Sequence, residues 1–167
     1  LRVLRFVPPA GRMGADMDAT ISGAAQDTTR WLTEPEQQAW RSYLRATRLL
    51  EVALDRDLAH HGTQLSEYEV ISMLSEAADG RMRMSALADL VVQSRSRITH
   101  TAARLEKRGW VRREACLDDR RGVELVLTDA GREHVDAMAR CHVTSVREHL
   151  IEVLEPAEFI ALGNALQ

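Results

Sequence analysis

Apolar side chains recur at intervals of three and four residues from Trp40 to Leu58, which predicts one long amphipathic helix. Its start is predicted at Thr33, whose hydroxyl suits an N-cap, with Pro35 in the first turn. Its end is predicted at Gly62, because glycine readily adopts the left-handed conformation that follows a helix. A helix of this length cannot bury its apolar stripe alone, so we expect it to pack against another long helix.

Shorter elements follow, and the capping and turn residues between them predict three helices and a β-hairpin. Ser66 and Glu69 have the spacing of a capping box, and Asp79-Gly80 ends the helix that they begin. Alternating apolar positions after Gly109 predict two strands joined by a charged turn. The expected elements are helices at 66–78, 85–91 and 94–108, an extended segment at 82–84, and strands at 110–116 and 123–127.

The C-terminal part reads as two further helices. Thr128 is expected to cap a long helix over 129–154, and Pro156 to start a final one. The stripe of the long helix consists of Val135, Met138, His142, Val146, Leu150 and Val153. This order predicts a mainly α (α+β) fold, in which a winged helix-turn-helix lobe with a two-stranded wing is flanked by long N- and C-terminal dimerisation helices. The expected divisions are a leader at 1–30, an N-terminal helix at 31–65, the winged lobe at 66–128 and C-terminal helices at 129–167.

Composition narrows the class of protein. The 167 residues are 45% apolar and 28% charged, with a formal net charge of −3, so the chain is globular and is not a polycation. Cys116 and Cys141 form neither a disulfide framework nor a CxxC pair. The sequence has no apolar run long enough to span a membrane, so we expect a soluble cytoplasmic protein without a membrane partner.

The charge is distributed unevenly along the chain. Residues 94–121 contain nine basic and four acidic side chains, a net charge of +5, whereas the remainder carries −8. These residues span the third of the short helices and the hairpin, which are the two elements that contact DNA in a winged helix. The segregation therefore predicts double-stranded DNA as a partner.

The helix at 94–108 has two distinct faces. Ile98, Ala102 and Leu105 are expected to point into the core. Two groups of polar side chains are expected toward DNA, one reading base edges and one contacting phosphates. The base-reading group is Arg95, Ser96, Thr99 and His100, and the phosphate group is Arg97, Thr101 and Arg104.

The segments RLEKRGWVRR and DRRGVELVLTDAG carry a longer pattern. An Asp-x-Arg turn, an apolar strand and Leu-Thr-x-x-Gly follow one another, at Asp119, Arg121, Leu127, Thr128 and Gly131. In this pattern the chain resembles the MarR family of winged-helix transcriptional regulators. The resemblance covers about Ser66 to Arg132 by motif, and Trp31 to Gln167 by the order of the helices.

The resemblance implies a homodimer whose first and last helices interlock, and a repressor that binds a pseudo-palindromic operator. It also implies that Arg121 enters the minor groove while Asp119 holds the wing in shape, with Arg120 as a second candidate for the groove. A guanidinium group suits the negative potential of a narrow minor groove. Relatives of this kind often bind small aromatic acids between the dimer helices and the lobe. Weak candidates for binding such an effector are Arg41, Arg45 and Arg48, for which an ordinary solvated role is the favoured interpretation.

Two other classes of function stay open. Cys116 could be an exposed thiol beside Arg112 and Arg113, as in a redox-responsive regulator, and a winged helix can also serve as a protein-interaction module. Catalysis is not expected, because the chain has no glycine-rich phosphate loop, nucleophile elbow or HExxH motif. No cofactor or metal is expected either, since His134, His142 and His149 lack the spacing that chelates on one helix face.

Overall fold

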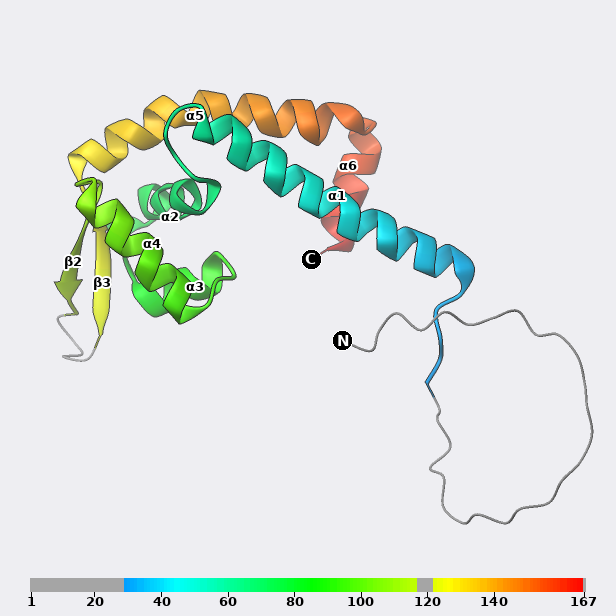
Figure 1. The fold of residues 1–167 in the computed structure, drawn as a ribbon, viewed down its shortest axis with the longest axis horizontal. Coiled ribbons are helices and arrows are strands. Elements are labelled where there is room, and N and C mark those ends of the chain that lie inside the picture. The colour runs from blue at the N-terminus through cyan, green and yellow to red at the C-terminus, as the bar shows by residue number, and fades with distance from the viewer. Residues whose placement is uncertain (1–28, 117–121, 167) are drawn as a thin grey trace, which may run out of the picture.

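The computed structural model describes residues 29–116 and 122–166, and Figure 1 shows a two-helix arm above a small lobe. The arm consists of α1 (Glu34–Ala59) and α5 (Asp129–His149), which lie side by side although about 70 residues separate them. The lobe between them in sequence contains α2 (Leu65–Glu76), α3 (Met84–Leu90) and α4 (Arg95–Lys107). After α5 the chain turns through η2 (Ile151–Val153) into α6 (Pro156–Ala165).

The start of α1 confirms the prediction, whereas the helix ends at Ala59, three residues before the predicted Gly62. The Thr33 hydroxyl accepts from the Glu36 backbone N–H at 3.5 Å, and the Glu36 carboxylate accepts in return from the Thr33 N–H at 2.7 Å. Gly62, with φ of +74°, lies in the turn that follows the helix. Leu58 is the only residue of α1 that is buried within the described part of the chain. Most of the apolar surface of α1 is therefore left for a partner or for solvent.

The lobe has a three-stranded antiparallel sheet, in which β3 (Val123–Leu127) lies between β1 (Arg81–Arg83) and β2 (Val111–Ala115). The predicted hairpin is confirmed as β2 and β3, with Arg113 opposite Leu125. The extended segment expected at 82–84 is the third strand, and Met82 faces Leu125 from the other side. The sheet includes the wing strands and ties them to the core.

The core of the lobe lies between α2, α3, α4 and the sheet. Ile98, Ala102 and Leu105 are each at most 1% exposed, which confirms the predicted inner face of α4. The surrounding members of this core are Val70, Ile71, Leu74, Leu87, Ala88, Val111, Leu125, Leu127 and Val135. Because Val135 belongs to α5, the arm and the lobe share one hydrophobic core.

Several predicted helix boundaries are shifted, among them those of α2 and α5. Helix α2 begins at Leu65, not after Ser66, because Gln64 has the extended N-cap conformation and donates its N–H to the Glu67 carboxylate at 3.2 Å. Helix α5 ends at His149, five residues before the predicted end. Leu150 leaves the helical region, and the β-branched Ile151 and Val153 that follow are weak helix formers.

Gly131 explains the last position of the Leu-Thr-x-x-Gly pattern. Thr128 caps α5 by accepting from the Gly131 N–H at 3.0 Å, and its own hydroxyl donates to the Gly109 carbonyl at 2.7 Å. A Cβ atom at position 131 would collide with the Trp110 carbonyl oxygen and would lie 2.8 Å from Leu127 Cδ1. Only glycine therefore lets α5 start this close to the start of β2 and the end of β3.

Candidate nucleic-acid interface

The four residues predicted to read bases lie together on one exposed side of α4. Arg95, Ser96, Thr99 and His100 occupy positions one and four residues apart, and all four are exposed. Ser94 caps the helix by accepting from the Arg97 N–H at 3.2 Å. The buried residues of α4 anchor its opposite side in the core, so the polar face is presented on a fixed helix.

The three residues predicted to contact phosphates differ from one another. Arg97 is exposed in the first turn of α4. Thr101 is 1% exposed, so the structure contradicts a phosphate contact for it. Its position, three residues after Ile98 and four before Leu105, places it on the core side. Arg104 lies near Thr101 and donates through Nε to the Glu67 carboxylate at 2.9 Å, which ties it to α2.

Arg113 is a residue that the sequence did not single out for the site. From β2 it donates to the Thr99 carbonyl oxygen at 3.1 Å, and it forms an ion pair with Glu106 at 3.7 Å. The Arg113 backbone N–H also donates to Glu106 at 3.2 Å. The wing strand β2 therefore contacts α4 directly. In the sequence, Arg113 was only one of the nine basic residues of 94–121, so its contact with α4 could not be recognised.

Two arginine side chains of the sheet form ion pairs with glutamates of the same sheet. Arg81 bridges Glu114 at 2.7 Å and Glu124 at 2.8 Å, and Arg112 pairs with Glu114 at 2.6 Å. The hydrogen bond from Arg112 is the main reason that the pKa of Glu114 is lowered, and both arginines add to this by their charge. The predicted wing residues Asp119, Arg120 and Arg121 lie outside the described residues, so their roles stay predictions.

A groove of about 770 Å³ separates α1 from the lobe. Glu51, Asp55 and Arg56 line it from α1, and Glu69 and Arg97 line it from the lobe. Burial raises the pKa of the Glu69 carboxyl, which accepts from Gln93 Nε2 at 3.5 Å. The remaining lining residues are Val52, Gln64, Leu65, Ser66, Val91, Val92 and Gln93.

The arginines suggested for an effector lie away from this groove. Arg41, Arg45 and Arg48 are exposed on α1, toward the N-terminal side of the residues that line the groove. Arg41 donates to Gln37 at 3.1 Å. The guanidinium groups that do line the groove belong to Arg56 and Arg97.

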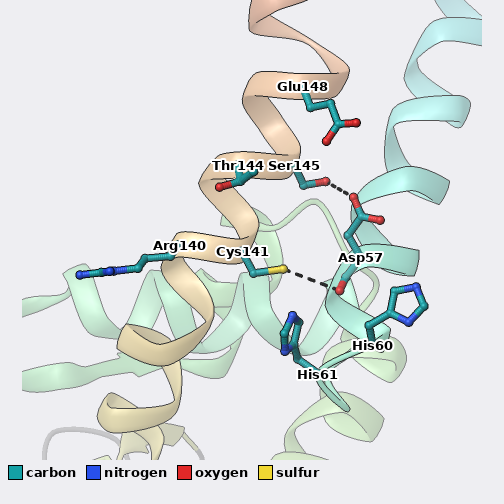
Figure 2. Close-up of a pocket in the computed structure, with 8 residues that line it drawn as sticks. All are labelled: Asp57, His60, His61, Arg140, Cys141, Thr144, Ser145 and Glu148. Atoms are coloured by element: carbon teal, nitrogen blue, oxygen red, sulfur yellow. Dashed lines mark hydrogen bonds between the residues drawn. The ribbon is translucent and has the colours of Figure 1, made fainter.

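Figure 2 shows a second, shallower pocket between α1 and α5. Ser145 and Cys141 reach from α5 toward Asp57, at 2.6 Å from its carboxylate and 3.7 Å from its carbonyl oxygen respectively. Arg56 and His149 also contact this carboxylate, at 2.9 and 3.2 Å. These hydrogen bonds, that of Ser145 most of all, lower the pKa of Asp57 to about 2.

The structure also bears on the thiol and metal alternatives. Cys116 is 5% exposed, so the expectation of an exposed thiol beside Arg112 and Arg113 is wrong. Its backbone N–H donates to the Gly122 carbonyl at 3.0 Å, which continues the β2–β3 ladder one step beyond the Ala115–Val123 pair. Within residues 29–116 and 122–166, no three His, Cys, Asp or Glu side chains are placed to hold a metal ion. The helices of this same part are all too short or too polar to cross a membrane.

A capped helix with a polar outer face, preceded by a tight turn and followed by a β-hairpin, defines the class of winged helix-turn-helix proteins. Within that class, the chain belongs to the MarR family, whose sequence pattern matches residues 64–123. The crystal structure of AbsC, a MarR family transcriptional regulator from Streptomyces coelicolor, is 46% identical with a TM-score of 0.78, covering 83% of this chain and 94% of AbsC.

Two further relatives are informative. The structure of Sco3205, a MarR family regulator from Streptomyces coelicolor in complex with DNA, is 42% identical with a TM-score of 0.78, covering 84% of this chain and 89% of Sco3205. The HTH-type transcriptional regulator PecS of Dickeya dadantii is 28% identical over 107 residues. That match covers 64% of this chain and 64% of PecS.

Proposed function

We propose that this protein is a sequence-specific transcriptional regulator that binds a pseudo-palindromic DNA operator as a homodimer and acts as a repressor. The observation that carries the proposal is the exposed face of α4, where Arg95, Ser96, Thr99 and His100 lie together on a helix anchored in the core. Side chains of these types match the donor and acceptor pattern of base edges in the major groove. The likeness to a relative solved with DNA supports the same conclusion.

The proposal gives the helix and the wing different roles. Arg97 contacts a phosphate at the start of α4, because it is exposed and lies beside the base-reading face. Arg121 enters the minor groove from the wing, Asp119 orients it, and Arg120 is the second candidate. The neutralised arginines of the sheet, Arg81 and Arg112, stabilise the base of the wing and do not contact DNA.

The homodimer follows from apolar surface that this chain leaves uncovered. Leu49 and Val52 on α1 are 57% and 66% exposed, and no described residue of α6 is buried. A second copy that interlocks α1, α5 and α6 would cover these faces. A two-fold dimer places two copies of α4 about one helical turn, roughly 10 base pairs, apart, which is why the operator should be a pseudo-palindrome.

Selection of bound fragments from a genomic DNA pool tests the function directly. The selected duplex and a mixed-sequence duplex are then titrated with the protein over a range of salt concentrations. We expect tighter binding to the selected duplex and a linear fall of log K with log salt for both. Absence of salt-dependent duplex binding would contradict the proposal, and would favour a protein-interaction module.

Variants of α4 test the two roles within it. Thr99→Ala or His100→Ala should change base preference by about 1–3 kcal/mol at particular positions. Arg97→Gln should weaken binding to all sequences similarly and reduce the salt slope by about 1.8, because each protomer of the dimer loses one phosphate contact worth about 0.9. Arg147→Gln, which removes an exposed charge at the far end of α5, is the matched control and should leave both unchanged. Equal loss of specificity from both groups would mean that α4 is rotated in the complex.

Release of DNA by a small aromatic acid belongs to the proposal as well. A carboxylate in the groove between α1 and the lobe would meet Arg56 and Arg97, and its ring would meet Val52 and Val91. Because Arg97 also contacts a DNA phosphate in this proposal, a bound acid would compete with DNA for Arg97. Benzoate should then weaken DNA binding while benzyl alcohol does not, and equal effects of the two compounds would argue against an acid effector.

A further inference from the structure

A buried carboxylate that the sequence did not single out lies against the end of α4. We propose that this residue, Glu67, is a positioning residue for DNA binding, which holds α4 through Arg104 and Arg108 and keeps Arg104 off the phosphates. This inference rests on the proposed DNA-binding function. The three residues Glu67, Arg104 and Arg108 together form what we call the α4 clamp.

The clamp satisfies both oxygens of the Glu67 carboxylate. Glu67 lies in the first turn of α2 and is 1% exposed. Its Oε1 accepts from Arg104 Nε at 2.9 Å, while its Oε2 accepts from the Gln64 N–H at 3.2 Å and lies 3.6 Å from an Arg108 nitrogen. A buried carboxylate without such partners would be strongly destabilising, so the folded lobe requires a cationic partner for Glu67.

Arg108 extends the clamp beyond α2. Its guanidinium donates to the Gly62 carbonyl at 2.6 Å and lies 4.8 Å from the centre of the Trp110 ring. The Trp110 ring also stacks on His134 of α5, at 3.7 Å between ring centres. His134 in turn lies 2.7 Å from the hydroxyl of the buried Thr63. The end of α4 is thereby joined to the α1–α2 loop and to α5.

The clamp fixes the rotation of α4, which the apolar contacts of the helix cannot do alone. Burial of Ile98, Ala102 and Leu105 holds the helix against the lobe, but apolar contacts are not directional. Hydrogen bonds to a charged group are directional and short, so they fix the rotation of α4 about its own axis. That rotation decides which side chains of α4 face the bases.

The clamp also changes the charge that α4 offers to DNA. Arg104 and Arg108 share the negative charge of Glu67, whereas Arg97 has no salt bridge within 4.0 Å among the described residues and acts on Glu69 only through its charge. Arg104 should therefore contribute little to counterion release, although it lies on the same helix. Its substitution should affect sequence preference more than salt dependence.

The double variant Glu67→Gln/Arg104→Gln tests this assignment, because it leaves the net charge unchanged. Affinity for the selected duplex and for a mixed-sequence duplex is measured by fluorescence anisotropy over a range of salt concentrations. We expect the wild-type salt slope, together with a roughly tenfold smaller preference for the selected duplex, as for misaligned base contacts. Arg97→Gln is the matched comparison, with a slope reduced by about 1.8 for the two protomers and its preference retained.

Each other outcome overturns the inference in a distinguishable way. A slope reduced as in Arg97→Gln would make Arg104 a phosphate ligand, and an unchanged preference would reduce the clamp to a structural role. If the double variant does not fold, Arg104→Lys replaces it. Lysine keeps the charge without the guanidinium geometry, so the clamp predicts a lost preference, and a phosphate contact predicts wild-type behaviour. Wild-type protein that binds no duplex would contradict the proposed function itself.

Discussion

At the scale of single residues, Val92 is held in an unfavourable backbone conformation. It lies in the turn before α4 with φ of +51°, and its side chain is 91% exposed. A β-branched residue is strained in this region, while asparagine tolerates it. We expect Val92→Asn to raise the free energy of unfolding by about 1 kcal/mol in chemical denaturation. Val92→Thr keeps the branched shape and should give no gain, so an equal gain from both would refute strain as the cause.

Replacing Gly131, unlike replacing Val92, should destabilise the fold. Its Cβ would collide with the Trp110 carbonyl, so Gly131→Ala should force α5 away from the sheet and cost about 1–3 kcal/mol or more. Gly163, within α6, is the matched control, because a Cβ atom added there would meet no described atom of this chain within 4 Å. Gly163→Ala should leave stability unchanged or raise it by up to about 1 kcal/mol. Thermal unfolding of both variants compares them, and similar losses would contradict the packing argument.

At the scale of elements, Asp57 joins α1 to α5, and these contacts favour its ionised form. Its pKa is lowered to about 2 from an ordinary value of 3.8, first by the hydrogen bond from Ser145. A lowered pKa means that the stabilisation is complete above about pH 4 and is lost as the pH falls toward 2. Asp57→Asn should therefore be less stable than wild type near neutral pH, and the difference should shrink between these two values.

The check is the free energy of unfolding of both proteins, measured in urea at a series of pH values. Ser145→Ala removes the largest cause of the shift and should show the same trend with a smaller amplitude. A difference between wild type and Asp57→Asn that stays constant down to pH 2 would mean that Asp57 acts through its shape alone.

The starts of α1 and α2 show that local sequence determines some helix boundaries and not others. The start of α1 was predicted from Thr33 and Pro35, and the Glu36 that completes the cap lies only three residues from Thr33. For α2, the pairs Gln64–Glu67 and Ser66–Glu69 both offer acidic residues at the right spacing, and only the first is used. The choice depends on Arg104, 37 residues away, which draws Glu67 into the lobe. No local pattern contains that information.

The residues of the site also differ in whether local sequence could reveal them. Helical periodicity placed Arg95, Ser96, Thr99 and His100 on one exposed face correctly. It failed for Thr101, because that position lies at the edge of the buried stripe, where a small rotation of the helix decides exposure. Arg113 and Glu67 could not be found from the sequence, since each acts on α4 from another element.

At the scale of the whole molecule, α6 predicts the assembly state. Ile160 is 61% exposed, on a helix that buries none of its described residues within the chain. We expect sedimentation at micromolar concentration to show a dimer, and Ile160→Arg to shift it to a monomer, because a charge would be buried in the interface. Leu90→Arg, at an exposed apolar position on the lobe, is the control and should stay dimeric. A wild-type monomer would contradict the proposed assembly.

The stack of Trp110 on His134 has a spectroscopic consequence. The chain has three tryptophans, and Trp31 and Trp40 are 56% and 47% exposed near the start of α1. Trp110 instead lies half-buried where α4, the α1–α2 loop and α5 meet. Replacing Trp31 and Trp40 by phenylalanine would leave one indole, whose emission reports on that junction alone. The wavelength and lifetime of this emission would then follow any movement of the lobe against the arm in real time, without an attached dye.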